Sequence, residues 1–125
     1  MIMDLKEYQL FTELLKRYTV LHILLKVIPL EVQELRHSRL KLSRLYCRLL
    51  ERVHGRVEQD IKLLRRQMAE LGGHIISEEQ EKTFRRVTAK FRGYLYQQRY
   101  ANDVLRGECE ELLLYYMTSE RGVKQ

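Results

Sequence analysis

Apolar residues recur every three or four positions along two long stretches of the chain, and this spacing constrains the fold more than any other feature. Side chains at that spacing lie on one face of a helix. We therefore predict a first helix over about residues 4–37 and a second over about residues 42–71. The apolar stripe of the first consists of Phe11, Leu14, Tyr18, Leu21, Leu25 and Ile28, and that of the second of Leu42, Leu45, Leu49, Val53, Val57, Ile61, Leu64, Met68 and Leu71.

Proline and glycine mark where these helices are expected to bend or stop. Pro29 lies inside the first stripe. Its ring removes a backbone donor and crowds the preceding turn, so we expect a kink there or a break just before it. Gly72 and Gly73 follow the last apolar residue of the second stripe. Because glycine in that position commonly ends a helix, the second helix should stop at Leu71.

The segment after these glycines has the period of a strand. Val87, Ala89 and Phe91 alternate with polar residues, which places them on one face of an extended chain. Upstream, the β-branched "HIIS" is followed by the polar "EEQEKT", which suits a turn. We predict a β-hairpin with strands at about residues 74–79 and 84–92, closed by Gly93.

A third helix is predicted over about residues 94–117, where the clearest apolar stripe is Leu105, Cys109, Leu112 and Tyr116. One long helix from residue 78 to residue 117 also fits much of the apolar spacing. A chain of 125 residues can bury one core, so we expect a single domain over residues 1–125. The predicted fold is mainly α (α+β), an antiparallel three-helix domain with one β-hairpin between the second and third helices.

Several short motifs in this region resemble a known group of proteins. The order is "GGHII", a polar turn, "FRGY", "RYANDVL" and "EELLLYYM". It resembles small uncharacterised proteins of Bacillus-type bacteria and their prophages, and it covers roughly the last two-thirds of the chain. The resemblance implies a helical pair, a short strand pair ending in "GY" and a final helix. It implies no activity and no functional residues.

The positive charge of the chain is concentrated in two segments. Residues 36–56 hold seven basic residues and one acidic residue, a net charge of +6, and residues 83–106 hold six and one, a net charge of +5. A strongly basic surface suits nucleic acid or an acidic protein partner, provided that the two segments converge in space. The candidate residues are Arg44, Arg48, Arg52 and Arg56 in the first segment and Arg86, Lys90, Arg92, Tyr96, Arg99 and Tyr100 in the second.

The spacing of these residues suggests how they would act. The four arginines of the first segment recur every four residues, so on a helix they form one slowly drifting stripe. Tyrosines interleaved with arginines could stack on bases while the guanidinium groups contact phosphates. Two other interpretations stay open: the stripe is a solvated face, or the basic residues pair internally, for example with Glu78, Glu79 and Glu81.

The first helix carries a second apolar stripe, formed by Val20, Ile23 and Val27 with Leu24 near its edge. A helix that is apolar on several sides is buried on several sides. Either the hairpin or the segment after Pro29 covers this stripe, or it forms an interface with a homodimer partner or another protein.

No motif indicates catalysis or a bound cofactor. The four histidines are isolated, and His22 fits a packed helix residue better than a ligand. The two cysteines fit free buried thiols, and the adjacent pair of Glu78 and Glu79 fits a surface. We therefore expect a non-enzymatic binding protein with no metal and no cofactor. The most apolar stretch, residues 18–30, is too short for a membrane span, and the start of the chain does not resemble a signal peptide, so we expect a soluble cytoplasmic protein without a membrane partner.

Overall fold

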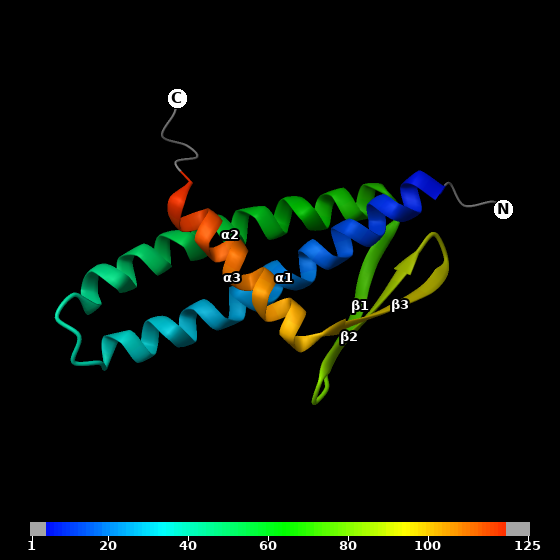
Figure 1. Ribbon diagram of the computed structural model, residues 1–125. Coiled ribbons are helices and arrows are strands. Elements are labelled where there is room, and N and C mark those ends of the chain that lie inside the picture. Colours follow the sequence, from blue (N-terminus) through cyan, green and yellow to red (C-terminus); the bar gives the residue numbers. More distant parts are fainter. Residues whose placement is uncertain (1–4, 120–125) are drawn as a thin grey trace, which may run out of the picture.

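The computed structural model describes residues 5–119 and shows two long antiparallel helices, a three-stranded sheet and a third helix (Figure 1). The helices α1 (Leu5–Arg36) and α2 (Ser43–Glu70) form a hairpin. The strands β1 (Gly73–Gln80), β2 (Phe84–Phe91) and β3 (Tyr94–Ala101) follow, and α3 (Asn102–Thr118) ends the fold. The sheet order is β1-β2-β3 with both pairs antiparallel. The sheet lies at one end of the hairpin and the α1–α2 loop at the other.

The helix α1 continues through Pro29 to Arg36, so the chain does not break at the proline. Ile28 and Val32, on either side of it, are 2% and 5% exposed and belong to the same core cluster as residues of α2. Packing on both sides of Pro29 therefore offsets the loss of one backbone donor.

The prediction of a single hairpin followed directly by a helix was wrong, because a third strand stands between them. Residues 94–101, assigned from the sequence to the third helix, form β3 and pair with β2 along its whole length. Arg92 and Gly93 have φ values of 53° and 87°, as in the two-residue turns that join twisted antiparallel strands. Gly93 therefore opens a second hairpin, and the alternative of a helix starting at residue 78 is excluded.

The first hairpin was predicted correctly. Strands β1 and β2 pair over the expected region, and Val87, Ala89 and Phe91 are all at most 1% exposed. The ring of Phe91 stacks on that of Phe11 in α1, with centroids 4.4 Å apart. This face of the sheet is thereby fixed against the first half of α1.

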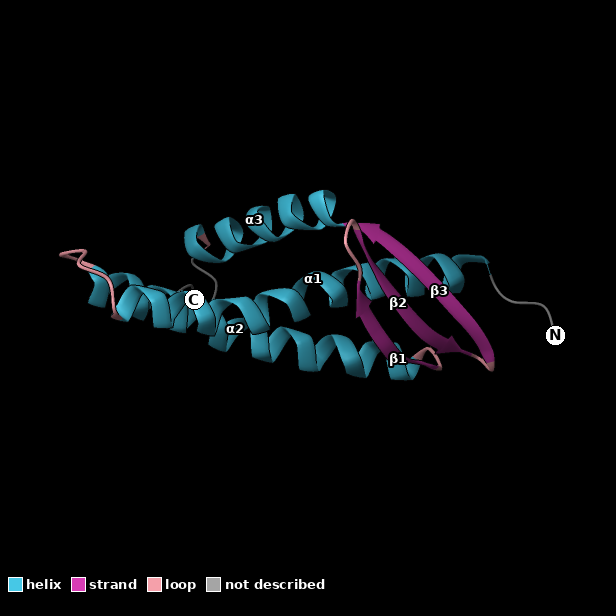
Figure 2. Cartoon of the chain, turned by 90° about the horizontal axis from the view of Figure 1, so that it is seen from below, coloured by secondary structure: helices cyan, strands magenta, loops and turns pink. Residues whose placement is uncertain are grey.

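Part of the second apolar stripe of α1, namely Val20 and Leu24, is covered by α3, which was not among the expected covers. Figure 2 shows α3 on one side of the α1–α2 pair, and Figure 1 shows that it crosses α1. Val20 and Leu24 are each 4% exposed, and the thiol of Cys109 in α3 lies 3.9 Å from the carbonyl oxygen of Val20. The three helices and the inner face of the sheet therefore enclose the core.

Candidate functional site

The basic residues of the α1–α2 loop and the start of α2 form an exposed group that we call the basic hairpin end. Its members are Arg39, Lys41, Arg44, Arg48 and Arg52. None of their side chains forms a hydrogen bond or ion pair with another residue in the described range 5–119. Three of them stand on successive turns of one rigid helix, about 6 Å apart along its axis. This group offers several unpaired guanidinium and ammonium groups to an anionic partner.

Arg56, the last member of the predicted stripe, has a different environment. It is partly buried, and its Nη1 donates to the carbonyl oxygen of Tyr116 at 2.8 Å. Its guanidinium carbon lies 4.9 Å from the centre of the Tyr116 ring. Because a spacing of four residues is slightly more than one helical turn, each arginine of the stripe is rotated a little further around α2 than the one before it. The last of them, Arg56, lies beside α3. Arg56 therefore binds the C-terminal end of α3 and does not extend the exposed group.

In the second basic segment, acidic side chains neutralise two of the predicted residues. Arg86 lies 2.5 Å from Glu79 and 3.5 Å from Glu81, and Arg92 lies 2.5 Å from Glu7 of α1. Internal pairing with the acidic residues around β1, one of the interpretations open from the sequence, is confirmed.

The two predicted tyrosines of this segment face the helices. The hydroxyl of Tyr96 shares a hydrogen bond of 2.7 Å with Thr12. The hydroxyl of Tyr100 is buried, and this burial raises the pKa of Tyr100. Neither ring is placed to stack on a base. Of the predicted residues in this segment, Lys90 and Arg99 are exposed, and the guanidinium of Arg99 lies 4.0 Å from the centre of the Phe84 ring.

The two basic segments do not converge. The start of α2 lies at the loop end of the hairpin, whereas β2 and β3 lie at the opposite end, and both views show this separation (Figures 1 and 2). The condition set from the sequence for one joint basic surface is therefore not met. The basic hairpin end is therefore a separate basic surface.

The predicted interface residues of α1 are divided between core and surface. Val20 and Leu24 are buried under α3, while Ile23 is partly exposed and Val27 is 38% exposed. Ile23 and Val27 line an apolar groove of about 450 Å³ between α1 and α3. Its other apolar walls include Ile28, Leu50, Leu105, Cys109 and Leu113.

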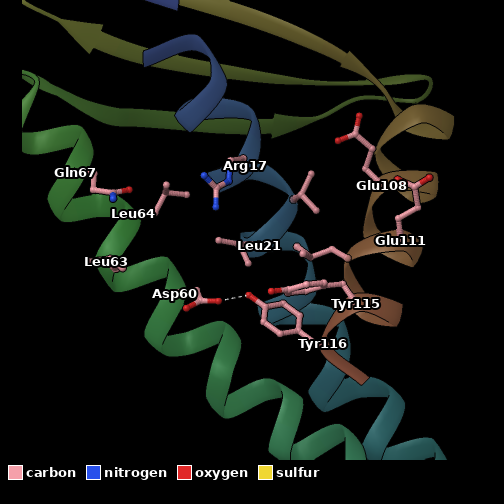
Figure 3. A pocket seen from close by; sticks show the side chains of 12 residues that line it. Arg17, Leu21, Asp60, Leu63, Leu64, Gln67, Glu108, Glu111, Tyr115 and Tyr116 are labelled. Carbon is pink, nitrogen blue, oxygen red and sulfur yellow. Dashed lines mark hydrogen bonds between the residues drawn. The ribbon is translucent and has the colours of Figure 1, made fainter. Parts of the chain in front are cut away.

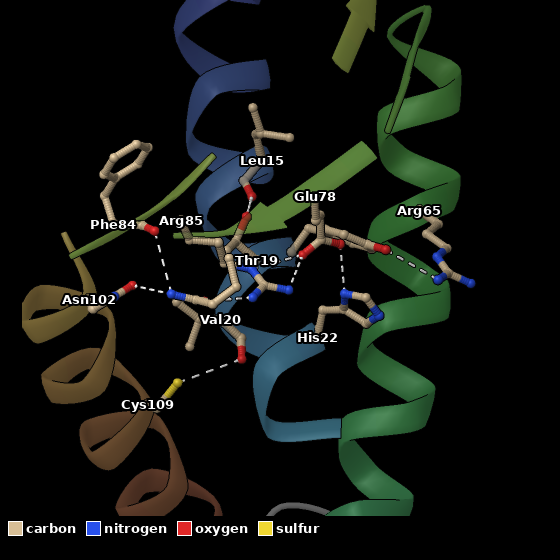
Figure 4. Close-up of polar contacts among 12 residues, drawn as sticks. Leu15, Thr19, Val20, His22, Arg65, Glu78, Phe84, Arg85, Asn102 and Cys109 are labelled. Atoms are coloured by element: carbon tan, nitrogen blue, oxygen red, sulfur yellow. Dashed lines mark hydrogen bonds and ion pairs between the residues drawn. The ribbon is translucent and has the colours of Figure 1, made fainter. Parts of the chain in front are cut away.

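A buried polar cluster links α1 to the sheet (Figure 4). Glu78 of β1 accepts hydrogen bonds from Nη2 and Nε of Arg85 at 2.7 and 3.1 Å, and its second oxygen lies 2.6 Å from Nδ1 of His22. The side chains of Glu78 and Arg85 are only 9% and 12% exposed. The ion pair of Glu78 and Arg85 joins β1 to β2 inside the fold, and the contact between Glu78 and His22 connects this pair to α1.

The surface position expected for Glu78 was wrong, and an irregularity in β1 is the reason. The register between β1 and β2 shifts between Ile75 and Ser77. Such a bulge inserts one residue into the strand and reverses the alternation of its two faces. Glu78 consequently lies opposite Val87 on the inner face, and Glu79 lies opposite Arg86 on the outer face.

A pocket of about 530 Å³ lies where the three helices meet (Figure 3). Arg17 of α1, Asp60 and Gln67 of α2, and Glu111 of α3 contribute polar groups to it. The hydroxyl of Tyr116 donates to Asp60 at 2.5 Å on one side of this pocket. None of these residues was selected from the sequence as a site, because the residues that complete the pocket around each of them come from other helices.

Comparison with protein families gives one result. A family model described as YhjD protein matches residues 7–121. The chain belongs to the YhjD family. No curated protein and no solved structure matches it significantly. The matched range covers nearly the whole chain, and the description of the family names no activity.

Two further observations concern the described part of this YhjD-family chain. Between residues 5 and 119, no group of three or more histidine, cysteine, aspartate or glutamate side chains is arranged to hold a metal ion. In the same range, every helix is too short or too polar to cross a membrane.

Proposed function

We propose that this protein is a non-enzymatic binding protein that contacts nucleic acid through the basic hairpin end. The observation that carries the proposal is the group of five exposed basic side chains without an acidic partner in the described chain. Like charges on successive helical turns repel one another, so this group does not stabilise α2. Contacts with phosphates would remove that repulsion and release counterions, which favours binding at low salt.

The proposed surface is smaller than the one expected from the sequence. Lys90 and Arg99 at the sheet end form a separate, weaker patch, because Arg86 beside them is paired with Glu79 and Glu81. A cytoplasmic location and an origin in Bacillus-type bacteria or their prophages belong to the same proposal, and they rest on the sequence patterns alone.

An acidic protein is the competing partner for the basic hairpin end. Leu45 and Leu49 are 47% and 36% exposed on the same part of α2, and Leu40 and Leu42 in the adjoining loop are 53% and 55% exposed. Exposed leucines among basic residues suit an interface in which a partner supplies both carboxylates and apolar side chains. Phosphates would leave these leucines in water.

A second candidate function is protein interaction through the groove beside α1, including self-association as a homodimer. The groove between α1 and α3 favours it, because Ile23 and Val27 line apolar space that no described residue fills. Replacing Val27 with glutamate should produce a folded chain that no longer self-associates, as measured by sedimentation. Val20 is unsuitable for this test, because it is buried and its replacement would unfold the protein.

The test of the main proposal is a titration of fluorescent single- and double-stranded oligonucleotides over a range of salt concentrations. A first variant replaces Arg44, Arg48 and Arg52 with glutamine, and a matched control replaces Lys90 and Arg99 at the other end of the molecule. We expect the wild-type affinity to fall linearly with salt on logarithmic axes. In the triple variant the slope of log affinity against log salt concentration should be smaller in magnitude by about two to three, and in the control variant it should change less.

The outcomes separate the hypotheses. Absence of binding at low salt, or a triple variant that binds like the wild type, would refute nucleic-acid binding at this surface. Replacing Leu45 and Leu49 with serine should leave oligonucleotide affinity unchanged. If this double variant loses binding to an acidic amphipathic peptide while oligonucleotides never bind, the acidic protein partner is the better proposal.

A further inference from the structure

The two edges of the sheet differ in how well they could pair with another strand. β1 contains the register shift between Ile75 and Ser77 and carries the adjacent carboxylates of Glu78 and Glu79. A bulge and charged side chains are features by which proteins prevent pairing at a sheet edge. β3 pairs with β2 along its whole length without a shift, and it contains no proline, lysine or acidic residue. Figure 2 shows β1 beside α2 and β3 on the opposite side of the sheet, so β3 is a long and regular edge strand.

Every second residue of β3 directs its backbone N–H and C=O groups toward the open edge. In a hairpin closed by a two-residue turn, the residues that flank the turn exchange two hydrogen bonds, and so does every second pair beyond them. Phe91 and Tyr94 flank the turn, so the backbone groups of Leu95, Gln97 and Arg99 point away from β2. Among residues 5–119, none of these backbone groups has a hydrogen-bond partner. They are therefore available to another strand.

We propose that β3 pairs in antiparallel orientation with β3 of a second copy of this chain, around a two-fold axis. The two three-stranded sheets then form one continuous sheet. With the axis at Gln97, this residue lies opposite Gln97 of the second copy, and Leu95 of each copy lies opposite Arg99 of the other. Each of these pairs exchanges two backbone hydrogen bonds. The free backbone groups of both strands are thereby satisfied.

The side chains beside the open edge favour this register. Leu95 is 73% exposed, and in the dimer it is covered by the aliphatic part of Arg99 of the second copy. An axis at Arg99 would place two guanidinium groups directly opposite each other, which destabilises a sheet. An axis between Gln97 and Arg99 would require hydrogen bonds from Ala101, whose carbonyl oxygen belongs to α3 because Ala101 is its N-cap. With the axis at Gln97 the edge is complementary to itself, as a two-fold dimer requires.

This dimer is compatible with the proposed function and independent of it. The sheet lies at one end of the α1–α2 hairpin and the basic hairpin end at the other. Pairing through β3 therefore leaves both basic hairpin ends free. The dimer also differs from one formed through the groove between α1 and α3, because no residue of β3 lines that groove.

The experiment is sedimentation equilibrium of the full chain over a range of concentrations, with circular dichroism to check the fold of each variant. Gln97→Pro removes the central free N–H, and an edge strand tolerates proline where the N–H faces away from the sheet. Gln97→Thr is the matched control, because it changes the same side chain and retains the N–H. Leu95→Lys places like charges opposite each other across the axis, and adding Arg99→Glu restores a pair of opposite charges.

We expect the wild type to form a dimer. Gln97→Pro should raise its dissociation constant by about tenfold or more, because one hydrogen bond is lost from each copy, and Gln97→Thr should raise it by less than about threefold. Leu95→Lys should raise the dissociation constant by about fivefold or more. The double variant Leu95→Lys with Arg99→Glu should return to within about threefold of the wild type.

A chain that is monomeric at every concentration would overturn the proposal. So would a folded Gln97→Pro variant that dimerises like the wild type, or a double variant as weak as Leu95→Lys alone. If Gln97→Pro does not fold, the comparison of Leu95→Lys with the double variant decides. A dimer that is lost in Val27→Glu and kept in Gln97→Pro would form through the groove and would also overturn the proposal. Oligonucleotide titration of the same variants tests the basic hairpin end separately, so failure of the dimer leaves the proposed function untouched.

Discussion

Replacing Gly73 with alanine tests the packing at the junction of helix and sheet. Gly73 is the first residue of β1, and a methyl group built there would lie 2.3 and 2.7 Å from two ring carbons of Phe11. It would also lie 3.1 Å from the carbonyl oxygen of Lys90. Phe11 is fully buried and stacked on Phe91, so the ring has no free direction in which to move. We expect Gly73→Ala to lower the free energy of unfolding by about 1–3 kcal/mol, the usual cost of overpacking a core.

The assay is urea denaturation followed by circular dichroism. With a slope of about 2 kcal/mol per molar urea, the midpoint should fall by about 0.5–1.5 M. Gly55→Ala is the matched control, because its added methyl group meets nothing within 4 Å and lies inside α2. The free energy of unfolding of Gly55→Ala should be higher than that of the wild type by up to about 1 kcal/mol. The double variant Gly73→Ala with Phe11→Leu should lose less than the sum of the two single changes. A Gly73→Ala midpoint equal to that of the wild type would refute this packing.

Three other predictions follow from the same structure. In urea denaturation, Glu78→Gln should lower the free energy of unfolding by about 3 kcal/mol or more, because it leaves Arg85 as a buried charge without a carboxylate. Glu79 is 57% exposed, so Glu79→Gln should lower the free energy of unfolding by less than about 1 kcal/mol. Burial and the nearby Glu108 carboxylate raise the pKa of Cys109 to about 11. Iodoacetamide reacts only with the thiolate. At pH 8, Cys109 should therefore be alkylated more slowly in the folded chain than in the unfolded chain, as measured by peptide mass spectrometry. In the folded chain the alkylation rate should increase with pH up to about pH 11. Gly93 has a φ of 87°, and an added methyl group there would meet nothing within 4 Å. Gly93→Ala should therefore lower the free energy of unfolding by about 1 kcal/mol through backbone strain alone. An unchanged urea midpoint would contradict a left-handed turn at this position.

The helices and the first strand pair could be predicted because their signals are local. In α1 and α2 each apolar side chain is three or four residues from the next, so the stripe is visible without knowing what covers it. The alternation at Val87, Ala89 and Phe91 is equally local, and all three are buried as expected. In α1 the burial of apolar side chains on both sides of Pro29 stabilises the helix by more than the proline destabilises it, so the helix continues.

The third strand and the position of Glu78 could not be predicted in the same way. Residues 94–101 contain tyrosines that fit a helix or a strand, and their pairing with β2 decides between the two. Glu78 turns inward because the register shifts after Ile75, and such a shift appears only when two strands are paired.

The sequence by itself determined how much positive charge the chain carries and on which elements, since charge is a property of each residue. The tertiary structure decided which of those charges are available. A helix of 28 residues is about 42 Å long, so α2 alone separates the basic hairpin end from the sheet. Arg56 and Arg92 are bound by groups distant in the chain, Tyr116 and Glu7, and Arg86 is bound by Glu79 across the β1–β2 hairpin. The pocket lined by Arg17 and Glu111 exists only where three helices meet, so no local pattern in the sequence indicates it.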